Sequence, residues 1–186
     1  MNILITGSTG QVGYELQRQL ADRGVVTAVD RQQCNLADPE SIRACVERVR
    51  PDWIINAGAW TAVDKAETER DAAFAVNAEA PRLLAELAAA RGARLVHYST
   101  DYVFAGDKPG HYREEDAVQP LNAYGASKLA GEQAIAAVMA TSDLQAWTFR
   151  TTWVFGVHGN NFLKTMLKLA QRRDSLSVVN DQFGAP

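Results

Sequence analysis

The chain has few cysteines and no long apolar run. Only two of its 186 residues are cysteines, Cys34 and Cys45, and their spacing fits neither a CxxC motif nor a set of metal ligands. No run of about 18 apolar residues occurs, so no membrane-spanning helix is predicted. The N-terminal string "MNILITGSTG" lacks the basic and apolar regions of a secretory signal. These absences argue against disulfide-rich secreted proteins and membrane proteins, and they predict a reducing, cytoplasmic compartment.

A strong charge of either sign is also missing. The net charge is -3 and basic residues do not cluster, which argues against nucleic acid as a partner. A hydrophobic content of 47% and a charged content of 22% are those of an ordinary globular protein. No repeat or linker divides the chain, so we expect one domain with a sizeable core over residues 1–186.

Short apolar runs alternate with longer helical patterns along the chain. The runs are rich in aliphatic and β-branched residues, as is typical of strands buried on both faces. They cover residues 2–6, 25–30, 52–58, 94–99 and 145–150, with a weaker run at 176–179, and helical stretches lie near 11–22, 38–49, 69–91, 125–140 and 160–173. This order predicts an α/β fold, a doubly wound and mainly parallel sheet with helices on both faces.

Two segments do not fit this alternation. Residues 105–120 are rich in glycine, proline and charge, and they predict a long surface loop. The sequence stops at Pro186, shortly after the weak strand signal, with no further helix to close the fold. We therefore expect the chain to be a truncated part of a longer protein.

A glycine-rich turn follows the first predicted strand. The string "LITGSTGQVGYEL" places Gly7, Gly10 and Gly13 at three-residue intervals before and inside the first helix. Such glycines permit a tight turn, let the backbone approach a pyrophosphate, and let the helix pack closely on the strand. The N–H groups of Gln11 and Val12, at the helix start, then face the phosphates. The pattern indicates a Rossmann-type NAD(P)-binding domain; a glycine turn that binds nothing is the alternative.

The end of the second predicted strand bears on the choice of cofactor. Asp30 stands where a carboxylate can accept hydrogen bonds from an adenosine ribose, which favours NADH. Arg31 follows it and can offset the 2′-phosphate of NADPH, so we expect both cofactors to bind. The alternative for Asp30 is ordinary turn chemistry.

A tyrosine and a lysine lie four residues apart in "YGASKLAGE". Tyr124 and Lys128 share one face of a predicted helix, where the ammonium can approach the phenol or a ligand that lies across both. A nearby ammonium favours phenolate and lowers the pKa of a tyrosine. Because many ordinary amphipathic helices contain the same spacing, the pair alone does not indicate catalysis.

Several strings in the chain resemble one family of enzymes. The glycine spacing, "NAGA" at 56–59, "STD" at 99–101 and "YGASK" at 124–128 are similar to extended short-chain dehydrogenase/reductases. More narrowly, "TAVDKAE", "VHYSTDYVF", "RTTWVFG" and "VVNDQFGAP" resemble the dTDP-4-dehydrorhamnose reductase family, over essentially all 186 residues. The resemblance implies hydride transfer from NADPH or NADH to the C4 keto group of dTDP-4-dehydro-6-deoxy-L-mannose. That substrate is a dTDP-linked 4-keto-6-deoxysugar, and the product is dTDP-L-rhamnose.

The resemblance assigns catalytic roles to three residues. Tyr124 would donate a proton to the new alkoxide, and Lys128 would assist it and hold the nicotinamide ribose. Thr100, at the end of the fourth predicted strand, would polarise the carbonyl oxygen. The alternative is that Thr100 caps a turn and that Tyr124 is a surface ring.

The resemblance also implies contacts with the cofactor. Ala59, Trp60 and Thr61 would line the nicotinamide side of the cleft, and Asn35 and Leu36 would lie at the adenine. Two of these positions depart from the family, since relatives usually carry aspartate at Asn35 and a smaller or different ring at Trp60. An asparagine can still hydrogen-bond an adenine edge.

Further residues are implied for the substrate and for a metal. Asp101, Tyr102 and Trp153 would contact the sugar nucleotide, although a core aromatic is the alternative for Trp153. Some relatives bind Mg²⁺ between subunits with a glutamate such as Glu15, which would require a homodimer. A solvated helix carboxylate is the favoured alternative for Glu15.

The largest departure from the family is the missing C-terminal substrate domain. Two other functions therefore stay open, a non-catalytic NAD(P)-binding regulatory subunit and another sugar-nucleotide enzyme such as an epimerase or dehydratase. The complete set of Thr100, Tyr124 and Lys128 argues against a pure binder. Dehydratases need additional acid and base groups beside the threonine, and here Asp101 is followed by Tyr102 rather than by glutamate.

Overall fold

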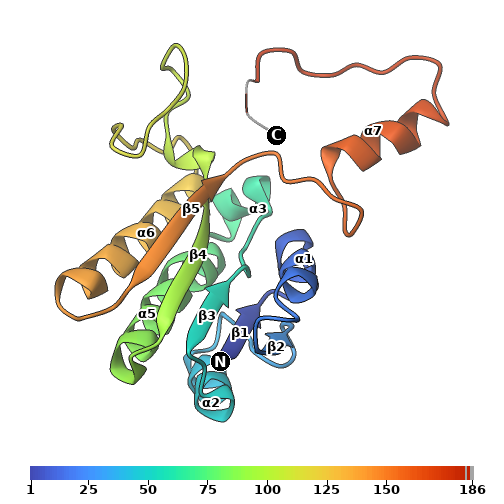
Figure 1. Ribbon diagram of the computed structural model, residues 1–186. Helices are drawn as coiled ribbons and strands as arrows, with labels where there is room; N and C mark the ends of the chain where they lie inside the picture. The colour runs from blue at the N-terminus through green and yellow to red at the C-terminus, as the bar shows by residue number, and fades with distance from the viewer. Residues whose placement is uncertain (183, 185–186) are drawn as a thin grey trace.

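A parallel sheet forms the centre of the molecule. The computed structural model describes residues 1–182 and 184. Five strands pair in parallel in the order β2-β1-β3-β4-β5 (Figure 1). They are β1 (Asn2–Thr6), β2 (Val25–Val29), β3 (Trp53–Asn56), β4 (Arg94–Thr100) and β5 (Ala146–Thr151). Each lies at an apolar run of the sequence, and the predicted α/β fold is confirmed.

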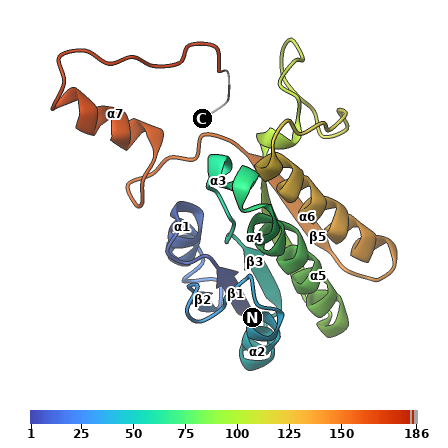
Figure 2. The ribbon, with the colours of Figure 1, turned by 180° about the vertical axis from the view of Figure 1, so that it is seen from behind.

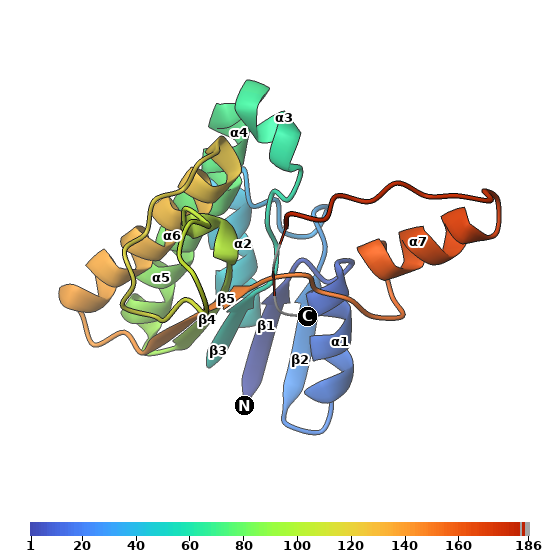
Figure 3. The same ribbon diagram turned by 90° about the horizontal axis from the view of Figure 1, so that it is seen from above.

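Helices lie on both sides of this sheet, as Figure 3 shows, with α1 on one side and α2, α5 and α6 on the other. Their bounds are α1 (Gln11–Gln19), α2 (Pro39–Val49), α5 (Ala80–Arg91) and α6 (Ala123–Ala140). The larger part of the core fills the three-helix side, where Leu4, Ile54 and Leu95 from adjacent strands pack with Ile42 and Leu84. Burial of these aliphatic side chains supplies most of the driving force for folding.

The opposite face of the sheet is covered unevenly. Near β1, Leu16 of α1 and Leu20, which follows the helix, pack against Ile3 and Ile5. Toward β5 this face is open to solvent, and Phe149 is 50% exposed. Figure 2 shows the same arrangement from behind.

The region between β3 and the end of α5 is helical, as predicted, but it contains two features that were not predicted. The helix expected near 69–91 is confirmed as a continuous run made of α4 (Arg70–Phe74), the π-helical segment η1 (Ala75–Glu79) and α5. The additional features are the π-helical turn and a short helix before the run, α3 (Val63–Thr68). The π-helical turn holds Asn77 in the interior, where its side chain bonds to two other segments. Such turns recur at functional sites.

The segment after β5 also differs from its prediction. The helix expected over 160–173 is shorter, as α7 (Phe162–Ala170), and it projects away from the sheet (Figure 1). The weak strand expected at 176–179 is wrong, because these residues are exposed and irregular and pair with no described strand. A strand needs a neighbour to bond its backbone groups. Residues 183, 185 and 186 of the "VVNDQFGAP" string lie outside the described residues.

The loop predicted at 105–120 is irregular and largely exposed, as expected. An ion pair between Lys108 and Asp116 holds the loop together, and Tyr112 of the loop stacks on Phe104, which precedes it. In the part of the chain that the structure describes, every helix is too short or too polar to cross a membrane.

Candidate functional site

A cleft of about 1250 Å³ opens at the carboxyl ends of the strands. Its walls come from the turns after β1 and β2, the segments after β3, β4 and β5, and the first two turns of α6. Ligand sites in open parallel sheets lie at this edge. Most of the predicted site residues line the cleft, namely Gly7, Gly10, Gln11, Val12, Asn35, Leu36, Ala59, Trp60, Thr61, Thr100, Asp101, Tyr102, Tyr124, Lys128 and Trp153.

The glycine-rich turn has no room for side chains at two positions. Gly7 has a φ of +68°, and a Cβ there would lie 2.6 Å from Gly58 Cα. A Cβ on Gly13 would lie 2.2 Å from the Gly7 carbonyl oxygen, so α1 packs directly on the turn. Gly10 is less crowded, and it precedes α1 without a side-chain cap. The first amides of α1, at Gln11 and Val12, are therefore placed to bind an anion.

The segment after β5 is anchored to this turn, which the sequence did not predict. Asn161 donates to Gln11 Oε1 at 2.9 Å, and Gln11 Nε2 donates to the Val154 carbonyl at 3.4 Å. His158 Nε2 lies 2.9 Å from the Thr9 carbonyl oxygen, and its ring stacks on Tyr14. The Gln11 side chain thus holds the segment in place.

The turn after β2 shows ordinary turn chemistry at its acidic residue. Asp30 Oδ1 accepts the backbone N–H groups of Gln32 and Gln33, at 2.9 and 3.0 Å, which is turn chemistry. Arg31 lines the cleft together with Asn35, and Asp30 is not among the described residues that line it. A ribose contact by Asp30 stays a prediction.

Asn77 fixes the turn after β3 and was missed from sequence. Its Oδ1 accepts the Trp60 N–H at 2.9 Å, and its Nδ2 donates to the Trp60 carbonyl at 3.0 Å and to Ser127 Oγ at 2.9 Å. This side chain therefore ties the predicted nicotinamide wall to α6. A polar residue within an apolar helical pattern, in "FAVNAEAP", was the signal that could have identified it.

Thr100, Tyr124 and Lys128 line the same cleft. Thr100 ends β4 and is 5% exposed. Tyr124 and Lys128 lie in the first two turns of α6, which begins with Asn122 accepting the Gly125 N–H at 2.7 Å. Lys128 is 1% exposed, and its ammonium donates to the Tyr98 carbonyl at 2.6 Å.

The pKa of Tyr124 differs from its prediction. We expected the ammonium of Lys128 to lower it, but burial of the phenol raises it, against a smaller lowering by the Thr100 hydroxyl. The expected lowering is wrong because burial dominates and the Lys128 ammonium is directed toward the Tyr98 carbonyl. Burial likewise lowers the pKa of Lys128 to about 8, although the charge of Glu132 opposes this.

The predicted substrate residues surround the mouth of the cleft. Tyr102 packs edge-on against Tyr124, and Thr100 donates to Asp101 Oδ1 at 3.1 Å. Trp153 is 41% exposed and has a φ of 49°, so it is not the core aromatic that was its alternative. A bulky residue with positive φ is an outlier of the kind found at ligand sites.

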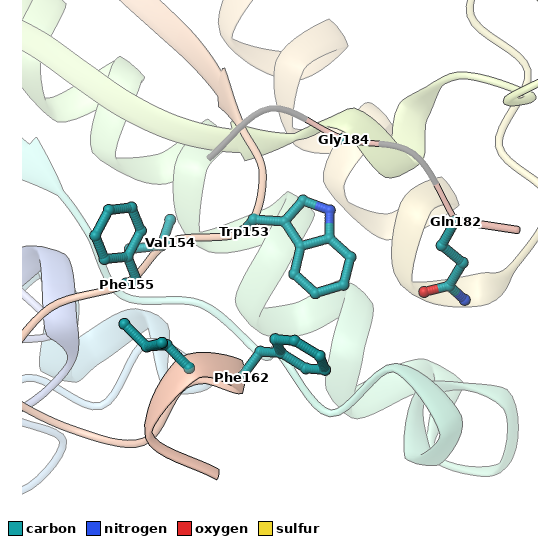
Figure 4. Close-up of a pocket in the computed structure, with 7 residues that line it drawn as sticks. Trp153, Val154, Phe155, Phe162, Gln182 and Gly184 are labelled. Carbon is teal, nitrogen blue, oxygen red and sulfur yellow. The ribbon is translucent and has the colours of Figure 1, made fainter. Parts of the chain in front are cut away.

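Trp153 also borders a smaller apolar pocket of about 440 Å³. Figure 4 shows its indole facing Phe162 of α7, with Gln182 and Gly184 on the other side. Trp153 therefore lines both the cleft and this smaller pocket, which lies next to α7.

Ser99 is a further cleft residue that sequence reasoning missed. Its hydroxyl is buried and, among the described residues, has no hydrogen-bond partner. A buried hydroxyl without a partner costs free energy, which a polar ligand atom would recover.

Glu15, the candidate metal ligand, lies half-buried on α1. Residues 1–182 and 184 contain no group of three or more His, Cys, Asp or Glu side chains that could hold a metal ion. Within this chain the structure gives no support for the Mg²⁺ site.

Comparisons with known proteins agree with this geometry. The family model described as RmlD substrate binding domain matches residues 1–186. The dTDP-4-dehydrorhamnose reductase of Burkholderia thailandensis is 51% identical over 187 residues, which cover 100% of this chain and 61% of that protein.

Two solved structures are also similar. A dTDP-4-dehydrorhamnose reductase of Clostridium acetobutylicum matches with a TM-score of 0.93 and 41% identity, over 100% of this chain and 65% of that one. The dTDP-4-dehydrorhamnose reductase of Bacillus anthracis, in complex with NADP, matches with a TM-score of 0.90 and 40% identity, over 97% of this chain and 63% of that one. The chain thus spans less than two thirds of each of these proteins.

Proposed function

This chain belongs to the family described as RmlD substrate binding domain, and from that membership we propose that it is the cofactor-binding part of a dTDP-4-dehydrorhamnose reductase. The proposed reaction is hydride transfer from NADPH or NADH to the C4 keto group of dTDP-4-dehydro-6-deoxy-L-mannose, which gives dTDP-L-rhamnose. One observation carries the proposal. A single cleft joins the glycine-rich turn to Thr100, Tyr124 and Lys128.

The turn after β1 fits a dinucleotide. Gly7 and Gly13 leave no space for a Cβ, so the backbone itself forms the wall, and the uncapped amides of α1 can bind the pyrophosphate. Arg31 lines the adenosine end, where its charge suits a 2′-phosphate. The orphan hydroxyl of Ser99 adds a site for a polar ligand atom. When bound, the nicotinamide cofactor supplies the hydride.

Tyr124 supplies the proton that the carbonyl oxygen gains in the reduction. Because burial raises the pKa of its phenol, Tyr124 stays protonated at neutral pH, which is the form that a proton donor needs. Thr100, at the end of β4, offers a hydroxyl that can polarise the same oxygen.

Lys128 has two proposed tasks. Lys128 lines the cleft, and in the proposed reaction its amine holds the nicotinamide ribose, which orients the reacting groups. Its pKa of about 8 also makes its ammonium a stronger acid than an exposed lysine, so it can return a proton to Tyr124 after turnover.

The sugar nucleotide would lie between Tyr124 and the residues Asp101, Tyr102 and Trp153 at the mouth of the cleft. Mg²⁺ binding by Glu15, a homodimer and a cytoplasmic location stay predictions.

A reduction assay tests the proposal. The chain, extended to the length of its curated relatives, is mixed with NADPH and dTDP-4-dehydrorhamnose, and the product is identified by mass spectrometry. We expect dTDP-rhamnose together with loss of the reduced cofactor. Cofactor binding without any product would reject the reductase and favour the non-catalytic alternative.

A further inference from the structure

Four buried polar side chains form a continuous row beneath the cleft. Thr6 on β1, Asn56 on β3 and His97 on β4 are neighbours in the sheet, and each is 1% exposed. The Thr6 hydroxyl donates to Asn56 Oδ1 at 2.6 Å, and Asn56 Nδ2 lies 3.0 Å from His97 Nδ1. His97 Nε2 lies 3.3 Å from the Nζ of Lys128. The row therefore ends on a residue of the proposed catalytic set.

The order of donors along this row determines where the imidazole carries its hydrogen. The Gly58 N–H donates to Thr6 Oγ1 at 3.3 Å, and the Thr6 hydroxyl hydrogen goes to Asn56 Oδ1. Asn56 must then turn its amide N–H toward His97 Nδ1, which accepts it. A neutral imidazole has one N–H, so this N–H is at Nε2 and points toward Lys128.

The imidazole is held in its neutral form, because the pKa of His97 lies well below its usual value. The main cause is burial, and the charge of Lys128 adds to it. An Nε2–H group can donate to the lone pair of an amine, but an ammonium has no lone pair. The contact therefore favours the amine form of Lys128. The Tyr98 carbonyl accepts from Lys128 in either form.

The other groups around Lys128 do not provide this contact. Glu132, one turn further along α6, favours the ammonium, but it is paired with Arg150 of β5 at 2.7 Å. Tyr124, one turn earlier, is an uncharged phenol at neutral pH. His97 is the titratable side chain within hydrogen-bond distance of the amine.

We propose that His97 is a positioning residue for the reductase reaction, whose Nε2–H holds the Lys128 amine in place and favours it over the ammonium, with Thr6 and Asn56 setting the tautomer. A lysine with lowered proton affinity returns a proton to the Tyr124 phenolate more readily, and it is then recharged from the cleft. The effect on catalysis rests on the proposed function. The tautomer of His97 and the titration of Lys128 can be measured whether or not the chain is part of a reductase.

The first test determines the tautomer of His97 in the wild-type protein. Nitrogen NMR of histidine-labelled protein, residues 1–186, reports which ring nitrogen of His97 carries hydrogen, and the signal is assigned by its absence in His97→Gln. We expect hydrogen on Nε2 and a neutral ring across the neutral pH range. Hydrogen on Nδ1 would overturn the proposal, because Nε2 would then accept from the ammonium.

The second test changes Thr6, at the opposite end of the row from Lys128, and measures the titration of Lys128. Thr6→Val removes the donor to Asn56 Oδ1, so the amide can rotate, His97 can shift its hydrogen to Nδ1, and Nε2 becomes an acceptor. The titration midpoint of Lys128, followed by carbon NMR of its ε-methylene, should rise by about one pH unit. Thr6→Ser keeps the hydroxyl and should restore the wild-type midpoint. His111→Gln, on the exposed loop, is the matched histidine control and should not shift it.

An unchanged midpoint in a folded Thr6→Val protein, or an equal rise in Thr6→Ser, would reject the role of His97. NADPH affinity is measured in the same samples. If wild-type protein fails to bind NADPH, the proposed function fails while the NMR titration still decides the role of His97. In the extended enzyme, Thr6→Val should move the alkaline limb of the kcat profile and leave KM unchanged.

Discussion

The two sides of the cleft, one formed by η1 and α6 and the other by the segment after β5, differ in how well their side chains are packed within this chain. On the side proposed to bind the cofactor, Asn77, Ser127 and Lys128 are buried and bonded to neighbouring elements. On the opposite side, Phe155 and Phe162 are 59% and 47% exposed, on the segment that leaves the sheet (Figures 1 and 4). These three buried polar side chains find their partners within the chain, whereas exposed aromatic clusters commonly mark a surface that another part covers. The proposed cofactor side is thus largely complete in this chain, whereas the proposed sugar side exposes an apolar surface.

Residues 1–186 alone give the strongest test of this difference. We expect them to bind NADPH but to reduce the sugar at least about 10³-fold more slowly than the extended chain, because loss of positioning and exposure to water remove several kcal/mol of barrier lowering. Fluorescence titration measures binding, and product formation measures turnover. Turnover equal to that of the extended chain, from protein confirmed by mass to end at Pro186, would contradict the comparison.

Tyr124→Phe, in the extended chain, should separate chemistry from binding. It removes the proposed proton donor and keeps the ring, so kcat should fall by about 10²–10⁴-fold while NADPH affinity stays nearly constant. Tyr112→Phe, on the surface loop, is the matched control and should keep full activity. If the Tyr124 variant retained more than about a tenth of the wild-type rate, the assignment would be wrong.

Gly13→Ala should damage the cofactor side specifically. The added Cβ would lie 2.2 Å from the Gly7 carbonyl oxygen, so α1 must shift away from the turn that faces the pyrophosphate. We expect NADPH affinity to fall by about 100-fold. Gly156→Ala, where a Cβ meets nothing within 4 Å, should leave affinity unchanged. Equal affinities in the two variants would show that the turn does not hold the cofactor.

The sequence predicted the strands and the glycine-rich turn better than the segment after β5, for a physical reason. Gly7, Gly13 and the apolar strands follow rules of local geometry and periodicity, so their arrangement could be inferred from the residues alone. Asn77 left only a weak signal, a polar residue within an apolar helical pattern, because its contacts are with segments distant in sequence. Ser99 left none, because the lack of a partner for its hydroxyl follows from burial in the folded chain. The π-helical turn that places Asn77 inside has no clear local signature.

Beyond β5, sequence reasoning failed where the fold lacks a neighbour. The residues at 176–179 have strand propensity, but in the described structure they have no strand beside them to pair with. The pKa of Tyr124 was predicted in the wrong direction because the spacing to Lys128 shows proximity along a helix and does not show burial.

The two nicotinamide cofactors should bind with affinities within about tenfold of each other, since Asp30 and Arg31 favour opposite ones. Arg31→Ala should weaken NADPH about tenfold more than NADH, because it removes the cation at the 2′-phosphate end of the cleft. Arg43→Ala, an exposed site on α2, serves as the control. Fluorescence titration with both cofactors decides, and a wild-type preference beyond about 100-fold would refute the prediction.

The smallest effect concerns the cost of burying Lys128. Its pKa is about 8 in the folded chain and near 10.4 in an unfolded one, so the unfolded state binds more protons between these values. The stability of the wild type should therefore rise as the pH increases from about 8 to 10.4, and below pH 8 the folded state carries the full penalty of the ammonium. Lys128→Met keeps the length of the side chain and does not titrate.

At pH 7 this variant should melt a few degrees higher than the wild type, since about 1 kcal/mol corresponds to about 2–4 °C in a chain of this size. The lost bond to the Tyr98 carbonyl limits the gain. The difference in melting temperature should shrink as the pH approaches 10, and Lys65→Met, on the exposed face of α3, should show no such trend. A difference that stayed constant from pH 7 to 10 would mean that Lys128 does not titrate in this window. The expected trend would instead show that the fold tolerates an unfavourable buried charge on the cofactor side, where the proposed chemistry needs it.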